Sequence, residues 1–304
     1  MTPSLGRLFS FGLLACIVLL ATPLAFLAQA SALTPVGSAL AATLPEMNTV
    51  TDGPWEVTLE GRVGFPTGHL QVVDRPTLGT RLRLSDLGID VSETLEGSVA
   101  FSATPRDAVR ASFLYYFLRG SSMQHGSVGY NGTLFAPGSL DANADFYRIS
   151  LAYERTLLSS PSHGRLVGSV GLTYDVVSPT LTGGGKTNTE SFGSIGFRTQ
   201  IPVPILGLRW DQSLAPNLLL RTSLSGGGLP HVDSLRKEET GATLYLEQAH
   251  ADLGAGLVYL LGRGAEIDGG YHFTYFRMRE TSVEDLNFFE LIDNGLYARV
   301  TLRF

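Results

Sequence analysis

The chain has 304 residues, a formal net charge of −6 and a charged fraction of 16%, against about 25% in a typical soluble domain. It contains no long run of lysine or arginine, so we expect no nucleic-acid partner. The single cysteine, Cys16, lies in the first apolar segment. The chain after it therefore forms neither disulfides nor cysteine-rich zinc sites.

Residues 1–32 have the order of a secretory signal peptide. A positive residue precedes an apolar run from 9 to 27, and the run ends at small residues with the A-x-A spacing. This order predicts export with cleavage after Ala30 or Ala32. An uncleaved anchor and a lipoprotein attached through the cysteine are the alternatives. Residues 33–53, rich in Ala, Thr and Pro without a clear period, predict a flexible leader.

From 54 to 304, apolar and polar side chains alternate with a period of two, as when Val57 and Leu59 alternate with Glu56 and Thr58. About ten such runs occur, each near the 9–11 residues that a tilted membrane strand requires. They begin near residues 55, 95, 109, 147, 166, 206, 218, 253, 267 and 296. The pattern predicts one all-β domain over 54–304, a transmembrane antiparallel up-and-down β-barrel of about ten strands.

One stretch leaves the strand number open. Residues 190–204 could be part of a long sixth strand, an extra hairpin arm or a segment folded into the lumen. Pro202 and Pro204 remove donors from a strand ladder, which makes an uninterrupted central strand unfavourable. Eight or twelve strands are therefore the alternatives to ten.

The connections between the runs alternate in length. Short turns with Pro, Asn, Asp and Gly lie at 104–107, 159–164, 215–217 and 261–264. Longer polar segments lie around 65–92, 120–144, 177–204, 227–242 and 279–293. Short turns at one end and long loops at the other are typical of outer-membrane barrels. A soluble β-sandwich or lipocalin-like barrel, the main alternative, predicts no such difference between its two ends.

The two faces of the strands differ in charge. A barrel in lipid turns its apolar face outward and its polar face into the lumen, and aromatic residues near strand ends form girdles at the membrane surfaces. The aromatic residues that suit a girdle are Trp55, Tyr115, Tyr153, Tyr174 and Tyr259. The charged residues predicted to line the lumen are Glu56, Glu60, Arg62, Glu96, Arg110, Arg148, Glu154, Asp175, Arg209, Asp211, Arg221, Glu266, Asp268, His272 and Arg299.

These lumen charges predict a network. A barrel of about ten strands is narrow enough for side chains of opposing walls to meet, and an isolated buried ion costs several kcal/mol. The charges should therefore pair into a salt-bridged plug. A narrow, weakly selective porin is the alternative, and the mixture of acids and bases predicts no strong ion preference.

At this point the chain resembles bacterial outer-membrane β-barrel proteins over roughly residues 54 to 304. The resemblance depends on the strand periodicity, the loop asymmetry and the terminal "LYARVTLRF". It implies location in the outer membrane and contact with its lipid and lipopolysaccharide. It also implies that Phe304 is part of the signal bound by the barrel-assembly machinery. "GTRLRLSDLGID", "SATPRDAVRASFLYYF" and "VPILGLRW" are similar to segments of uncharacterised barrels that bring no established activity.

Motifs for chemistry are weak. "GGGKT", residues 183–187, resembles the end of a phosphate-binding loop, but Thr180 stands where the motif needs glycine. His231 and Asp233 could form a base-and-orienter pair at the outer rim, which invites comparison with the omptin proteases. Asp141 and Asp145 do not have the omptin spacing.

We therefore expect no cofactor and no metal. The predicted role is non-enzymatic, that of a structural or surface-interaction barrel with long surface loops and an unknown extracellular ligand. The narrow porin and a rim-sited hydrolase of peptides or lipid A are the alternatives.

Overall fold

The computed structural model of the chain describes residues 53–75, 79–160, 164–191, 201–237, 241–262 and 264–304. The predicted signal peptide, 1–32, and all but the last residue of the predicted leader, 33–53, lie outside the described residues. So does 192–200, the middle of the stretch that left the strand number open. Within the described residues, no helix is long and apolar enough to cross a membrane.

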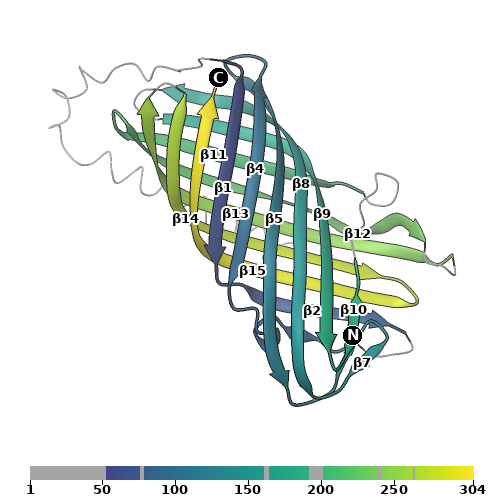
Figure 1. Cartoon of the computed structure of the whole chain (residues 1–304). Helices are drawn as coiled ribbons and strands as arrows, with labels where there is room; N and C mark the ends of the chain where they lie inside the picture. The colour runs from purple at the N-terminus through teal and green to yellow at the C-terminus, as the bar shows by residue number, and fades with distance from the viewer. Residues whose placement is uncertain (1–52, 76–78, 161–163, 192–200, 238–240, 263) are drawn as a thin grey trace, which may run out of the picture. The chain divides into compact units, whose positions relative to one another are not determined.

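Ten long strands in the described part of the chain close into an antiparallel ring (Figure 1). They are β1 (Trp55–Gly64), β4 (Ser92–Ser102), β5 (Asp107–Gln124), β8 (Gly138–Ser160), β9 (Gly164–Gly183), β11 (Val203–Ala215), β12 (Leu218–Lys237), β13 (Thr243–Gly262), β14 (Ala265–Thr281) and β15 (Asp285–Arg303). Each pairs with the next in this order, and β15 pairs with β1. The predicted all-β, up-and-down barrel of ten strands is confirmed.

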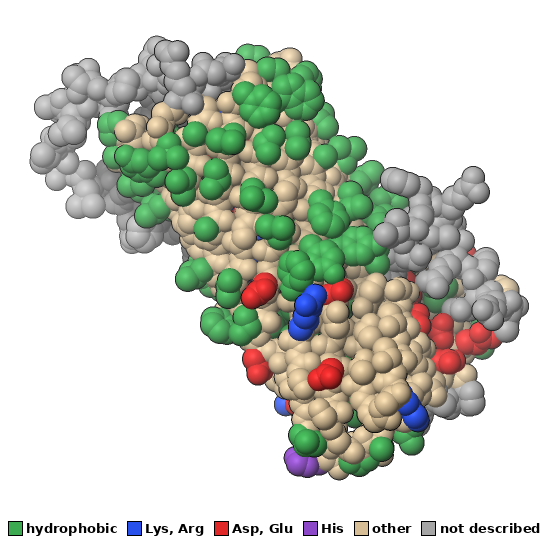
Figure 2. Space-filling view, in the orientation of Figure 1, with side chains coloured by type: hydrophobic (Ala, Val, Ile, Leu, Met, Phe, Trp, Pro, Cys, Tyr) green, Lys and Arg blue, Asp and Glu red, His purple; other side chains and the backbone are tan. Residues whose placement is uncertain are grey.

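The outer surface of the barrel carries an apolar belt. Leu59 and Leu296 face outward and are 56% and 69% exposed, whereas Glu60, one residue from Leu59, faces the lumen and is 3% exposed. Trp55 and Phe101 lie side by side on neighbouring strands at the edge of the belt where β1 begins, with ring centroids 4.9 Å apart. Figure 2 shows apolar side chains gathered over one part of the barrel and charged side chains beyond them. Alternation of this kind is what a barrel in lipid requires.

The barrel has one end with short turns. Trp55 and Phe304 meet there, each backbone N–H donating to the other's carbonyl oxygen at 3.0 Å. Gly164 begins β9 at this end with φ 75°, and a Cβ atom on it would lie 2.2 Å from the carbonyl oxygen of Asp211, so this position needs glycine. Short turns mark the periplasmic end of an outer-membrane barrel, and the opposite end then faces outside.

The outer end differs from the prediction of long loops, because the strands continue well past the apolar belt. β5, β8, β9 and β12 extend into the segments predicted as loops, and 279–293 is strand except for a turn at 282–284. In these extensions most outward-facing side chains are polar, among them Arg119, Ser121 and Asp141, as expected for strands surrounded by water rather than lipid. This polarity made the segments look like loops in the sequence.

Short elements complete the outer end: β2 (Thr67–Asp74), β3 (Leu82–Arg83), the 3₁₀ turn η2 (Ser85–Leu87), β6 (Val128–Tyr130), β7 (Thr133–Phe135) and β10 (Lys186–Thr189). β2 continues the course of β1 after the Phe65-Pro66 break and pairs with the outer half of β15. β6 and β7 form a two-residue hairpin in which Asn131 and Gly132 both have positive φ, 44° and 70°, the geometry of a type I′ turn.

Candidate functional site

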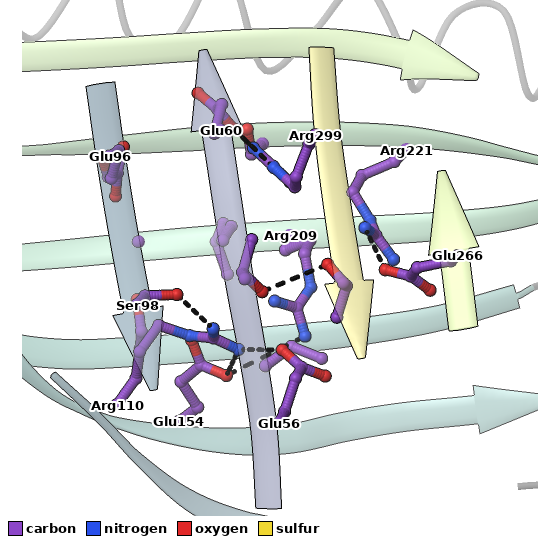
Figure 3. A pocket seen from close by; sticks show the side chains of 18 of the residues that line it. Glu56, Glu60, Glu96, Ser98, Arg110, Glu154, Arg209, Arg221, Glu266 and Arg299 are labelled. Carbon is purple, nitrogen blue, oxygen red and sulfur yellow. Dashed lines mark hydrogen bonds and ion pairs between the residues drawn. The ribbon is translucent and has the colours of Figure 1, made fainter. Parts of the chain in front are cut away.

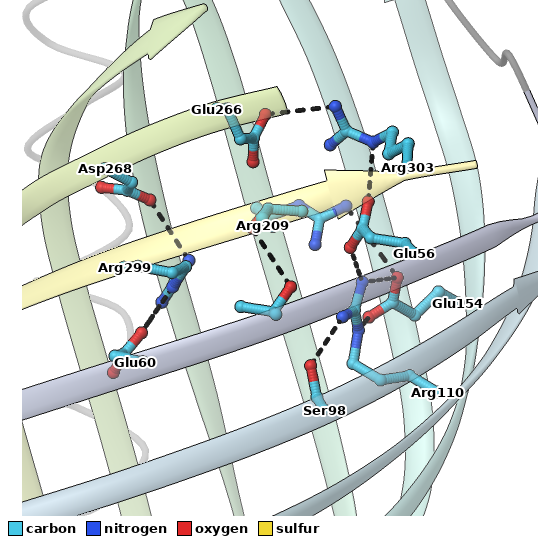
Figure 4. Close-up of polar contacts among 12 residues, drawn as sticks. Glu56, Glu60, Ser98, Arg110, Glu154, Arg209, Glu266, Asp268, Arg299 and Arg303 are labelled. Atoms are coloured by element: carbon cyan, nitrogen blue, oxygen red, sulfur yellow. Dashed lines mark hydrogen bonds and ion pairs between the residues drawn. The ribbon is translucent and has the colours of Figure 1, made fainter. Parts of the chain in front are cut away.

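The periplasmic half of the lumen contains a closed ring of ion pairs, and Figure 4 shows the part from Glu266 through Arg303, Glu56 and Arg110 to Glu154. Around the wall, acid and base alternate through Glu56, Arg110, Glu154, Arg209, Asp211, Arg221, Glu266 and Arg303, which pairs again with Glu56. The shortest N···O distances are 2.7 Å, and the two made by Arg209, at 3.8 and 3.9 Å, are the longest. The charges within the ring cancel, which a low-dielectric interior demands.

A second row of charges lies next to the ring. Asp268 accepts from Arg221 at 3.2 Å and from Arg299 at 3.3 Å, and the Tyr297 hydroxyl donates to it at 2.9 Å. Arg299 also pairs with Glu60. Glu60 in turn pairs with Arg62, which pairs with Glu96. Each of these ion pairs joins residues of one strand, of neighbouring strands or of next-but-one strands, so the network runs around the inner wall of the barrel.

A cavity of about 250 Å³ lies among these charges (Figure 3). Besides the ion pairs, its wall carries hydroxyl groups: Thr58, Ser98, Ser169, Ser223, Ser225 and Thr301. A smaller pocket of about 20 Å³ at the turn between β4 and β5 shares Glu154 and Val167 with it, so the cavity lies toward the periplasmic end. A polar space of this size has room for several water molecules.

Arg148 lies at the boundary between the polar region and the outer half of the lumen. Its Nε lies 2.6 Å from an Asp175 carboxylate oxygen, and its Nη1 lies 3.1 Å from Asp252. The guanidinium carbon also lies 5.6 Å from the ring centroid of Phe146 and 5.8 Å from that of Phe276. One side chain therefore ends the polar half by ion pairing and begins the apolar half by cation–π contact.

His272 belongs to a separate polar contact in the middle of the lumen. Its Nε2 lies 3.4 Å from a carboxylate oxygen of Asp293, whose other oxygen accepts a hydrogen bond from Ser92 at 2.8 Å. Gly64 provides the space for this carboxylate, since a Cβ atom there would lie 2.3 Å from Asp293 Oδ1. Glycine therefore stands at the last position of β1, where the carboxylate needs the space.

The outer half of the lumen is a hydrophobic core. Tyr116, Phe146, Phe276 and Phe289 cross it at the level of Arg148, and each is at most 1% exposed. Neighbouring ring centroids are 5.4, 4.4 and 6.0 Å apart along this series. Farther out, the walls contribute Leu118, Leu140, Ala142, Ala144, Val177, Leu181, Leu246 and Met278, whereas Leu114 and Leu291 lie in register with Arg148 and Phe276.

Two segments from the outer end fill the centre of this core. Leu82, Leu84, Leu87 and Ile89 come from the chain around η2, and Val128, Tyr130 and Phe135 come from the β6–β7 hairpin. The Tyr130 hydroxyl donates to the Pro179 carbonyl at 2.6 Å. Burial raises the pKa of this phenol above its ordinary value, so the group stays protonated and remains a donor.

The structure therefore places a polar lumen in one half of the barrel and an apolar lumen in the other. The predicted charged residues all face the lumen, and most belong to the ring and its second row. Arg148 and Asp175 form the boundary, and His272 lies in its own contact. The outer half departs from the prediction because its strands project beyond lipid, where an apolar interior and a polar exterior are the stable arrangement.

The residues of the hydrophobic core were not predicted, whereas two further charged residues of the site lie on the predicted polar face. Arg303 and Asp252 continue the alternation of predicted faces, so the period of two was sufficient to find them. The hydrophobic core had a different signal. In Phe113-Leu114-Tyr115-Tyr116-Phe117-Leu118 both faces of the strand are apolar, which indicates a strand covered on both sides.

The rim residues considered for catalysis lie on two strands, His231 and Asp233 on β12 and Asp141 and Asp145 on β8. The His231 ring stacks on Tyr245, with centroids 4.7 Å apart and planes at 15°. Asp145 instead accepts a hydrogen bond from Asn143, and Asp141 is exposed on the outer face of β8. In the part of the chain that the structure describes, no group of three or more His, Cys, Asp or Glu side chains could hold a metal ion.

No protein-family model and no curated protein matches the chain. Among solved structures, it is similar to the outer membrane protease OmpT from Escherichia coli, with 12% identity, a TM-score of 0.44 and coverage of 83% of this chain and 97% of that one. The translocator domain of the autotransporter NalP from Neisseria meningitidis is 15% identical, with a TM-score of 0.41 and coverage of 93% of this chain and 97% of that one. An outer membrane channel from Pseudomonas putida F1 is 12% identical, with a TM-score of 0.37 and coverage of 86% of this chain and 100% of that one. Likeness at this level carries no functional argument.

Proposed function

We propose that this protein is a closed, non-enzymatic outer-membrane barrel that presents a rigid β-domain at the cell surface and does not conduct solutes. The observation that carries the proposal is the layer of Tyr116, Phe146, Phe276 and Phe289, each at most 1% exposed, whose rings are in contact across the lumen; we call it the dry layer. A hydrated pore needs a continuous polar path. The cavity on the periplasmic side is lined by none of these four rings.

The outer end supports a role in surface interaction. Its strands continue beyond the apolar belt, and the apolar segments around η2 and β6–β7 are packed inside them. A projecting part with its own hydrophobic core presents a fixed surface, and fixed surfaces lose little conformational entropy on binding. The ligand of that surface is a matter for binding experiments rather than for the fold.

Single-channel recording in a planar lipid bilayer tests closure. Refolded protein is expected to give no steady conductance steps. The matched variant Phe146→Ser/Phe276→Ser removes two aromatic rings from the dry layer and should give small steps or frequent brief openings. Steady ohmic steps from the unaltered protein would instead establish the narrow porin.

The rim-sited hydrolase has its own test. The Tyr245 ring that stacks on His231 holds the imidazole on the outer face of the sheet. Refolded protein should release no product from peptide or lipid A substrates. Product release that is lost in His231→Ala and kept in Asp141→Asn would contradict the non-enzymatic proposal.

A further inference from the structure

An arginine-rich patch lies on the outer surface of β14, β15, β2 and β3. Two cross-strand rows form it. In one row, Arg279 on β14 lies opposite Phe288 on β15, which lies opposite Gln71 on β2. In the other, Arg277 lies opposite Glu290, then His69, then Arg83. We define the basic patch as Arg81, Arg83, Arg277, Arg279 and the Phe288 ring between them.

The Phe288 ring gathers two of these arginines. The guanidinium carbon of Arg81 lies 4.8 Å from the ring centroid, and that of Arg277 lies 5.6 Å from it. Because both contacts share one ring, the two guanidinium carbons lie within about 10 Å of each other. Stacking on an aromatic ring holds the planar guanidinium in place while its N–H groups remain available to a ligand.

The arginines of the patch are only partly neutralised by the protein. Arg277 pairs with Glu247 at 3.4 Å, but its Nε has no hydrogen-bond partner. Among the described residues, Arg81, Arg83 and Arg279 form no ion pair within 4.0 Å. Glu290, the acid inside the patch, lies 3.1 Å from His69. A local excess of positive charge therefore stands on a chain whose net charge is −6.

The patch lies at the height of the outer membrane surface. Ile267 marks the lower part of the apolar belt on β14 and is 46% exposed. Arg277 is ten residues farther along the strand. At about 3.3 Å per residue and a tilt near 40°, that distance spans about 25 Å of the bilayer. Outward-facing apolar and aromatic residues, among them Phe273 and Tyr275, lie between the two, so the arginines begin where lipid tails end.

From this position we propose that the basic patch binds the phosphate groups of anionic glycolipid in the outer leaflet, the headgroup chemistry of lipopolysaccharide. Arginine forks match phosphate oxygens with paired hydrogen bonds. The opposite side of the barrel makes a useful contrast. In its outer part that side carries Arg119 together with the acids Glu93, Asp141 and Asp145, a surface that suits no anionic headgroup.

Lipid binding to the refolded full-length protein in nonionic detergent, followed by native mass spectrometry, tests the proposal. Phosphorylated lipid A should bind the unaltered protein, and Arg81→Ala/Arg279→Ala should bind it about 30-fold more weakly, as expected for two arginines near an anionic membrane surface. Dephosphorylated lipid A should bind the unaltered protein as weakly as the double variant binds the phosphorylated form. Inorganic phosphate at equal concentration should compete poorly, because it lacks the acyl chains that lie on the apolar belt.

Two controls keep the result interpretable. Heat-modifiable migration in detergent gels verifies that each variant has folded. Arg119→Ala removes an arginine that contacts an aromatic ring, Phe117, on the acidic side and should bind phosphorylated lipid A like the unaltered protein. Undiminished binding by the double variant, an equal loss in Arg119→Ala, or equal binding of the two lipid A forms would overturn the proposal.

Discussion

The two halves of the barrel fill the same closed sheet in opposite ways. In the periplasmic half, apolar side chains face lipid and charged side chains face a cavity of about 250 Å³. In the outer half, polar side chains face water, and the lumen is filled by aromatic and aliphatic residues with two inserted segments. The polarity of the sheet inverts within single strands: β14 turns Asp268 inward below the boundary and Phe276 inward above it.

The inversion follows the solvent. Each face of a strand takes the character that its surroundings stabilise, so a strand that leaves the bilayer exchanges its inner and outer preferences. Arg148 lies where the exchange occurs, with carboxylates on one side and aromatic rings on the other. One continuous barrel thus combines a periplasmic half built like a membrane barrel with an outer half built like a water-soluble one.

The largest effect is expected in the hydrophobic half. Phe276→Ala removes a ring that is 0% exposed and lies 4.4 Å from the Phe146 centroid. The cavity and the lost contacts should lower the free energy of unfolding by about 3–5 kcal/mol. Urea unfolding of the protein in lipid vesicles measures this. Phe113→Ala is the control, because its ring faces lipid and is 47% exposed; an equal loss in the control would mean that the core is not the source of stability.

A smaller loss is expected in the charged half. Arg221 is 6% exposed and contacts Asp211, Glu266 and Asp268. Arg221→Met leaves these carboxylates facing one another and should cost about 3 kcal/mol, at the lower end for a broken buried pair because the adjacent cavity admits water. The loss should shrink on lowering the pH, as protonated carboxylates repel less.

The same unfolding assay provides the control for that change. Arg155→Ala alters an arginine that is 57% exposed at the periplasmic rim and should change stability little, because exposed ion pairs contribute little. If the loss in Arg221→Met were independent of pH, carboxylate repulsion would not be its cause.

The strands and the charged face could be predicted from the sequence because both depend on local alternation. Residues as distant as Glu56 and Arg299 were assigned to the same lumen by their phase within separate strands. The partners could not be predicted in the same way. Arg110 meets both Glu56 and Glu154 because of the strand register and the barrel tilt, and alternation within one strand does not fix either quantity.

The hydrophobic plug shows a second limit. Leu84 and Leu87 lie in a segment with little strand pattern, and nothing in their local sequence states that they fold back into the lumen. The hairpin beside them was more accessible to prediction, since Asn131-Gly132 between short apolar runs is a strong hairpin signal. A soluble barrel and a membrane barrel were alternatives from the sequence, and each describes one end of this molecule.

The smallest effect on stability is expected outside both halves of the lumen. Phe304 is 60% exposed on the lipid face and pairs with Trp55 through two backbone hydrogen bonds. Deleting it should lower the unfolding free energy of the refolded barrel by only about 1–2 kcal/mol, since neither lumen half is touched. If Phe304 also serves as the signal for the barrel-assembly machinery, the amount of folded protein in cell outer membranes should fall several-fold.

Leu302→Ala, at a site 49% exposed on the same face, removes apolar surface but keeps the terminal residue, and should assemble normally. Equal assembly losses in the two variants would contradict the signal, and a loss of refolded stability as large as that of Phe276→Ala would show that the seam, not the lumen, holds the barrel together.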